Sequence, residues 1–199
     1  MLMGRWNLAL APGDFCYRCA ILAFIVLLPL PALALGGGTK EKLKSGGYVI
    51  LMRYAQTQKG PGDAANFDIN DCATQRNLAD VGRTGVTRIH ERFQKAGIKI
   101  ARAMSSRWCR AIDTAKLLAP AVNVEPRDEL AAYLDQKDPA LRRQIVGKIR
   151  KEIAEWKGPG NLLLVSHKRT IKEVSGRSLS EGGYIVIDPK TLRIIAEDN

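Results

Sequence analysis

The sequence predicts an α/β fold, a three-layer α/β/α sandwich in which helices cover both faces of a mostly parallel sheet. Two observations predict it. Apolar segments of strand length alternate with longer segments of helical period along the chain, which is the order typical of parallel α/β sheets. The last two predicted strands are joined by a short turn at residues 188–191, so they should form an antiparallel hairpin at one edge of the sheet.

Short apolar runs rich in β-branched residues mark the strands. They lie at 47–53, 101–105, 161–166, 183–188 and 192–196. Binding sites in open α/β sheets form just beyond the carboxyl ends of the strands. The first three of these runs end in polar residues that suit such a site, so the sequence predicts a functional site at that edge.

The segments between the strands predict three helices. Residues 80–97 and 139–156 repeat apolar side chains at intervals of three and four residues, which is the period of a helix with one buried face. Proline near the start of 139–156 and glycine just after its end also suit a helix. A third helix is predicted over 107–118, ending before Pro120.

Residues 1–34 resemble a secretory signal peptide. Arg5 and Arg18 supply a basic start, residues 20–34 form an apolar stretch, and Ala32-Leu-Ala34 fits a small-x-small cleavage site. The alternative is a membrane anchor, which needs ~20 apolar residues. This run is shorter and is broken by two prolines, so cleavage is the favoured interpretation.

The predicted mature chain, residues 35–199, is long enough for one domain. It would begin near Leu35, with residues 36–38 as a flexible lead-in. Export predicts a periplasmic or secreted location. The sequence contains no feature that indicates an oligomeric state.

The chain is strongly basic, with a formal net charge of +11. The predicted signal segment holds only Arg5, Arg18 and Asp14, so the remaining domain keeps a net charge of +10. Such a charge favours an anionic partner: nucleic acid, an anionic envelope surface or a phosphorylated small molecule. No nucleic-acid motif accompanies the charge, and the densest basic run, 142–151, lies on a predicted helix as a solvated face. We therefore expect no nucleic-acid partner.

Two of the four cysteines would remain after cleavage. Cys16 and Cys19 lie in the signal segment, whereas Cys72 and Cys109 lie in the mature domain. An even pair in an oxidising compartment favours one disulfide; two free thiols are the alternative. The cysteines and the two histidines have no spacing typical of metal ligands, so no metal is expected.

Three motifs lie at or next to the ends of predicted strands. They are the run Tyr48-Val-Ile-Leu-Met-Arg53-Tyr54-Ala55, the run from Ser105 to Ala115, and the run from Leu162 to His167. The first is similar to an apolar strand ending in Arg-His-Gly or Arg-His-Ala, the second to Ser-Ser-x-x-x-Arg-Ala-x-x-Thr-Ala, and the third to the strand of a second histidine. These motifs resemble those of the histidine phosphatase (phosphoglycerate mutase-like) superfamily, with Tyr54 where the nucleophilic histidine stands. The resemblance implies a phosphoglycerate mutase-like fold and no cofactor.

The resemblance also implies a phosphate-binding site. Arg53 and Arg110 would clamp the phosphate, because a guanidinium group stays charged and binds phosphate oxygens in pairs. His167 would be the second histidine and Thr57 a hydroxyl donor to the same anion. Surface ion pairs are the alternative role for the two arginines.

Tyr54 makes catalysis the open question. A neutral imidazole is a good nucleophile near pH 7, whereas a phenol is mostly protonated at that pH. A phosphotyrosine intermediate would also be a stable ester. Two functions remain: binding of a phosphate ester with lost or reduced phosphomonoesterase activity, or an active phosphomonoesterase that acts on an unidentified phosphate ester.

The general acid of such an enzyme is usually a carboxylate in a loop after the second helix. Four residues are candidates: Asp128, Glu129, Asp135 and Asp138. Residues 59–70 and 122–140 would form the pocket walls, and neither stretch contains a pattern that identifies the substrate.

Overall fold

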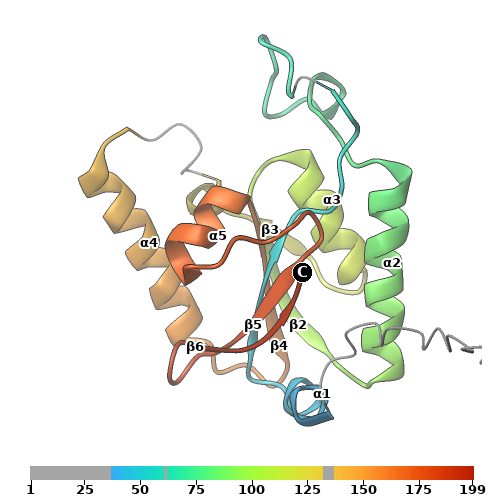
Figure 1. Ribbon diagram of the computed structural model, residues 1–199, viewed down its shortest axis with the longest axis vertical. Helices are drawn as coiled ribbons and strands as arrows, with labels where there is room; N and C mark the ends of the chain where they lie inside the picture. The colour runs from blue at the N-terminus through green and yellow to red at the C-terminus, as the bar shows by residue number, and fades with distance from the viewer. Residues whose placement is uncertain (1–36, 61, 132–136) are drawn as a thin grey trace, which may run out of the picture. The chain divides into compact units, whose positions relative to one another are not determined.

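A six-stranded mixed β-sheet organises the computed structural model (Figure 1). The structure describes residues 37–60, 62–131 and 137–199, so the predicted signal segment, Cys16, Cys19 and Asp135 lie outside the described residues. The strand order is β3-β2-β4-β1-β5-β6. The strands are β1 (Val49–Arg53), β2 (Ile100–Ser105), β3 (Val124–Pro126), β4 (Asn161–Ser166), β5 (Tyr184–Asp188) and β6 (Arg193–Asp198).

Strand pairing brings the ends of three strands to one edge. β1 pairs in parallel with β4, which sets Arg53 opposite Ser166. β2 also pairs in parallel with β4, with Ser105 opposite Val165. β5 runs antiparallel to both β1 and β6, as predicted for the C-terminal hairpin. The carboxyl ends of β1, β2 and β4 therefore lie next to one another.

Helices cover both faces of the sheet, and this confirms the predicted three-layer fold (Figure 1). α2 and α3 pack on one face, whereas α4 and α5 pack on the other. The helices are α1 (Gly37–Ser45), α2 (Asp80–Lys95), α3 (Cys109–Leu118), α4 (Pro139–Ala154) and α5 (Lys168–Ser175).

The apolar run of β1 is uninterrupted because both of its faces are buried. Ile50 and Met52 belong to the apolar cluster beneath α2 and α3, whereas Val49 and Leu51 belong to the cluster beneath α4 and α5. This alternation follows from the two-residue period of a strand. A central strand with helices on both faces needs apolar residues throughout, and its first polar side chain is Arg53, at its end.

Gly82 lets α2 pack against the segment that follows Tyr54. A Cβ atom at this position would clash with the backbone of Gln56, so only glycine allows the helix to approach so closely. The backbone amide of Ala79, just before the helix, donates to the carbonyl of Gln56 at 3.0 Å. The start of α2 thereby holds the chain just beyond the candidate site.

Three elements were not predicted, and each has a weak pattern. β3 has only three residues and ends at a proline. α5 carries four charged side chains and buries only Thr170, Ile171 and Val174. The expected flexible lead-in is wrong for Gly37 and Gly38, because they begin α1, which Leu43 anchors in the core; residue 36 lies outside the described residues. No helix in the described part of the chain is long and apolar enough to cross a membrane.

Candidate functional site

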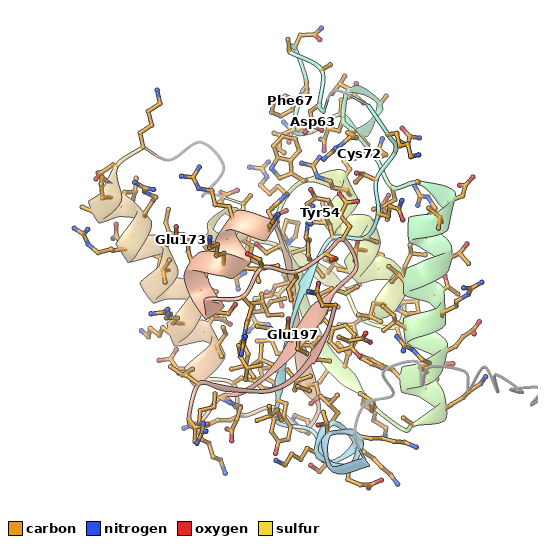
Figure 2. All side chains as sticks on the ribbon, in the orientation of Figure 1. Tyr54, Asp63, Phe67, Cys72, Glu173 and Glu197 are labelled. Atoms are coloured by element: carbon orange, nitrogen blue, oxygen red, sulfur yellow. A yellow bond between two sulfur atoms is a disulfide. The ribbon has the colours of Figure 1, made fainter. Side chains whose placement is uncertain are left out.

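Four side chains that the sequence singles out lie together where β1, β2 and β4 end. The Tyr54 ring is at their centre. The guanidinium carbons of Arg53 and Arg110 lie 5.2 and 5.0 Å from its centroid, and the His167 ring lies 5.2 Å away in an edge-to-face arrangement. Figure 2 shows Tyr54 just beyond the end of β1. Arg53, Tyr54, Arg110 and His167 therefore share one edge of the sheet.

Backbone hydrogen bonds fix Tyr54 after the strand has ended. Its amide donates to the Ser166 carbonyl at 3.1 Å, and its carbonyl accepts from the Gly182 amide at 3.0 Å. The side chain is buried, and its hydroxyl makes no hydrogen bond to another described residue. Its backbone is therefore held at this edge of the sheet, and none of the described residues accepts a hydrogen bond from its hydroxyl.

Arg53 is held by the segment before β5. Its Nη1 donates to the Leu179 carbonyl at 3.0 Å, and its Nη2 pairs with Glu181 Oε1 at 3.3 Å. Its Nε is buried and has no hydrogen-bond partner among the described residues. The guanidinium group is therefore only partly satisfied by the protein.

Thr57 contacts the same carboxylate instead of facing the pocket. Its hydroxyl donates to Glu181 Oε1 at 3.3 Å and its amide lies 3.3 Å from Oε2. It is not among the residues that line the cavity at Tyr54. The structure thus assigns the Thr57 hydroxyl to Glu181, and its contact with a phosphate stays a prediction from the resemblance.

Arg110 is the second residue of α3 and is almost completely buried, with 3% of its surface exposed. Its Nη1 donates to Asp63 Oδ1 at 2.9 Å and lies 3.4 Å from the Arg76 carbonyl. Its guanidinium carbon lies 4.4 Å from the centre of the Trp108 ring. Its Nε, like that of Arg53, is buried without a partner among the described residues.

His167 follows β4 and is the residue before α5. Its Nε2 lies 2.7 Å from the Ser106 hydroxyl. Burial, together with the charges of Arg110 and Arg53, lowers the pKa of His167 to about 3. The imidazole is therefore neutral at physiological pH, and it contributes hydrogen bonding without adding charge to a site that already holds two guanidinium groups.

Three of these four residues open onto a cavity of about 750 Å³, whereas Arg53 lies behind Tyr54 and is not among the residues that line it. Tyr54, Arg110 and His167 lie in its wall, together with residues that the sequence did not single out. Those residues are Asp63, Ala64, Ala65, Phe67, Arg76, Trp108, Lys168, Arg169, Lys172 and Ser178. Most of them come from the predicted wall segment 59–70 or from α5. They do not directly follow a predicted strand, so the search for polar residues at strand ends did not find them.

The carboxylates predicted as general acids do not line this cavity where the structure describes them. Asp128 is exposed and lies 3.6 Å from Arg107, and Asp138 caps the first turn of α4. Glu129 lies in a short 3₁₀ turn, and Asp135 is outside the described residues. Among the described residues, Asp63 is the carboxylate that does line the cavity.

The structure contains the disulfide between Cys72 and Cys109, with Cα atoms 5.7 Å apart. The prediction of a bond rather than two free thiols is therefore confirmed. Cys109 begins α3, and its backbone amide donates a hydrogen bond to Gln75 Oε1 at 3.0 Å. The bond ties the segment after the 59–70 loop to the helix that carries Arg110. No described group of three or more His, Cys, Asp or Glu side chains is arranged to hold a metal ion.

Solved structures with a similar fold include histidine phosphatases. The chain matches the protein histidine phosphatase SixA in complex with tungstate at a TM-score of 0.53 and 15% identity, over 75% of this chain and 95% of that one. SixA from Agrobacterium tumefaciens matches at 0.54 and 17%, over 77% and 97%. A mycobacterial glucosyl-3-phosphoglycerate phosphatase in complex with inorganic phosphate matches at 0.52 and 16%, over 76% and 96%.

The chain thus has the α/β fold of the histidine phosphatases, also called phosphoglycerate mutase-like. At these identities the likeness concerns the fold. Protein-family models and curated protein sequences give no match to the chain.

Proposed function

We propose that this protein binds a phosphate ester in the periplasm through Arg53, Arg110 and His167, with phosphomonoesterase activity that is lost or reduced because Tyr54 replaces the nucleophilic histidine. One observation carries the proposal. The Nε atoms of Arg53, Arg76 and Arg110 are all buried without a hydrogen-bond acceptor among the described residues, and Arg76 and Arg110 line the cavity at Tyr54.

An oxyanion is the ligand that such donors need. A buried donor without a partner is unfavourable by about 1 to 3 kcal/mol, and more when it is charged. Phosphate oxygens accept charge-assisted hydrogen bonds from guanidinium groups and can satisfy several at once. Surface ion pairs, the alternative role for these arginines, account for one carboxylate contact each but leave the Nε atoms unsatisfied.

The same geometry supports binding better than turnover. Transfer to Tyr54 would need a base to remove the phenol proton, and none of the described residues hydrogen-bonds to that hydroxyl. His167 is neutral, but its Nε2 is engaged by Ser106. A phosphotyrosine, if formed, would need a second set of catalytic groups for its hydrolysis.

The periplasmic location rests on two features. The N-terminal segment resembles a signal peptide, and the structure closes a disulfide between the two cysteines of the mature domain. Structural disulfides persist in oxidising compartments and are rare in the cytosol.

The first test is the affinity for inorganic phosphate and vanadate, measured by calorimetry on the exported protein. Arg110→Ala should weaken binding roughly 30-fold or more, because it removes a buried charged donor. Arg107→Ala is the matched control: it removes the same charge from a half-exposed side chain that pairs with Asp128 outside the cavity, and its affinity should stay within twofold. Equal binding by the Arg110 variant and the control would refute the assigned site.

The second test removes the carboxylate that competes for Arg110. Asp63→Asn should bind phosphate roughly tenfold more tightly, because the Asp63 charge repels an anion at this distance and occupies Nη1 at 2.9 Å. Calorimetric titration with inorganic phosphate measures the change. Asp128→Asn is the control, because it also removes one negative charge but at a residue outside the cavity. Weaker binding by Asp63→Asn than by the control would show instead that Asp63 positions Arg110 for the ligand.

A further inference from the structure

The cavity at Tyr54 extends beyond the four motif residues to an aromatic wall. The rings of Phe67 and Trp108 lie 4.6 Å apart with an angle of 31° between their planes. Phe67 comes from the loop after β1, and Figure 2 shows it near Asp63 on the loop that rises beyond Tyr54. This large apolar side chain is 37% exposed although it lines a cavity.

The aromatic wall is continuous with the anion site. One side chain, Arg110, stacks on Trp108 at 4.4 Å and also lies 5.0 Å from Tyr54. The Trp108 ring lies 6.2 Å from His167 and is almost buried. Trp108 is therefore a fixed support, whereas Phe67 still has a surface that a planar group could cover. Stacking on an aromatic side chain suits a nucleobase, because every base has a π face.

A basic wall faces the same cavity from the start of α5. Lys168, Arg169 and Lys172 all line it and are all exposed. None of the three has an ion pair or a side-chain hydrogen bond to another described residue. Asp63, the carboxylate in the cavity wall, is already paired with Arg110 at 2.9 Å. These three cations are therefore not neutralised by the described part of the protein.

The positive charge of the cavity, from the anion site and the basic wall together, exceeds the negative charge of one phosphate. The charged side chains that line the cavity are one carboxylate, Asp63, and five cations, Arg76, Arg110, Lys168, Arg169 and Lys172, which together give a net charge of +4. A phosphate monoester carries up to two negative charges, so positive charge remains in the cavity when one phosphate is bound. A second anionic group on the ligand would balance this remaining charge. The cavity, at about 750 Å³, is within the usual range for sites that enclose a small organic ligand.

We infer that the preferred ligand is a nucleoside bisphosphate: one phosphate binds at Arg53, Arg110 and His167, the base stacks on Phe67, and the second phosphate contacts Lys168, Arg169 and Lys172. This inference rests on the proposed function, because the first phosphate occupies the proposed site. It adds the chemical class of the ligand, which needs both a planar ring and a second phosphate.

The experiment is a calorimetric comparison of four probes at 0.15 M salt, a condition that limits non-specific attraction. The probes are inorganic phosphate, ribose 5-phosphate, adenosine 5′-monophosphate and adenosine 3′,5′-bisphosphate. Addition of the base to ribose 5-phosphate should raise affinity about tenfold. Addition of the second phosphate to the monophosphate should raise it about tenfold again.

Variants test whether the affinity gained from the base depends on Phe67 and whether the affinity gained from the second phosphate depends on the cations of α5. In Phe67→Leu the affinity ratio between the monophosphate and ribose 5-phosphate should fall towards one. In Lys168→Ala/Lys172→Ala the ratio between the bisphosphate and the monophosphate should fall likewise. The control Lys148→Ala/Lys190→Ala removes two exposed cations that do not line this cavity, and it should preserve both ratios.

The outcomes separate this inference from the proposed function. Phosphate binding that depends on Arg110, with neither gain from the base nor gain from the second phosphate, overturns the inference and leaves the proposed function intact. An equal loss of bisphosphate affinity in the control variant shows general attraction to a basic surface and also overturns it. Failure to bind inorganic phosphate or any other probe contradicts the proposed function itself.

Discussion

Replacement of Tyr54 by histidine should raise the hydrolysis of an aryl phosphate by at least ~10²-fold over the native protein, which should stay near background. A neutral imidazole at this position can attack phosphorus without a separate base and then leave to water, whereas a phenol cannot do either readily. Arg53, Arg110 and His167 already surround the position, so the change adds the nucleophile to an assembled site. Steady-state kinetics on the exported protein measures the gain.

Tyr54→Phe is the matched control, because it keeps the ring and removes only the hydroxyl. It should resemble the native protein, with activity near background and phosphate binding retained. Robust turnover by the native protein that Tyr54→Phe abolishes would overturn the assignment of lost activity. The phenol would then be a participant in catalysis.

Loss of the Cys72–Cys109 disulfide should lower the free energy of unfolding by about 3 to 4 kcal/mol. The bond joins residues 37 positions apart, and a closed loop of that length restricts the unfolded chain by roughly this amount. Cys72→Ser combined with Cys109→Ala avoids a new hydroxyl at the buried position 109. Urea unfolding monitored by circular dichroism should show a lower midpoint.

A reducing agent provides the internal control for that measurement. It should destabilise the native protein by a similar amount and leave the double variant unchanged. A variant as stable as the oxidised native protein would contradict the prediction, because it would mean that the bond gives no net stabilisation through the unfolded chain. Phosphate affinity measured on the same variant would then report how far the bond positions Arg110.

Sequence patterns predicted the strands with continuous apolar runs and the helices with one regular buried face. The run in β1 is apolar because helices cover both of its faces, and such runs are visible without a structure. β3 was missed because it is three residues long. α5 was missed because its charged side chains face the cavity and the solvent, which obscures the period of its few buried residues.

The proximity of the candidate residues was predicted where position along a strand determines position in space. Arg53 ends β1, Tyr54 and His167 follow the ends of β1 and β4, and pairing of these two strands places them together. Asp63, Phe67 and Arg76 come from a long connection whose path depends on the disulfide and on side-chain contacts. Glu181 contacts Arg53 across 128 positions of sequence. No local pattern contains that information.

The segment that holds Arg53 and Tyr54 also determines when the site can form as the protein folds. The partners of Arg53 and Tyr54 include Leu179, Glu181 and Gly182, near the end of the chain. A protein synthesised from its N-terminus exposes β1 long before these residues exist, and contacts so distant in sequence form slowly. The basic site therefore stays unassembled on a nascent chain, and its two guanidinium groups acquire their geometry only when the C-terminal segment has docked.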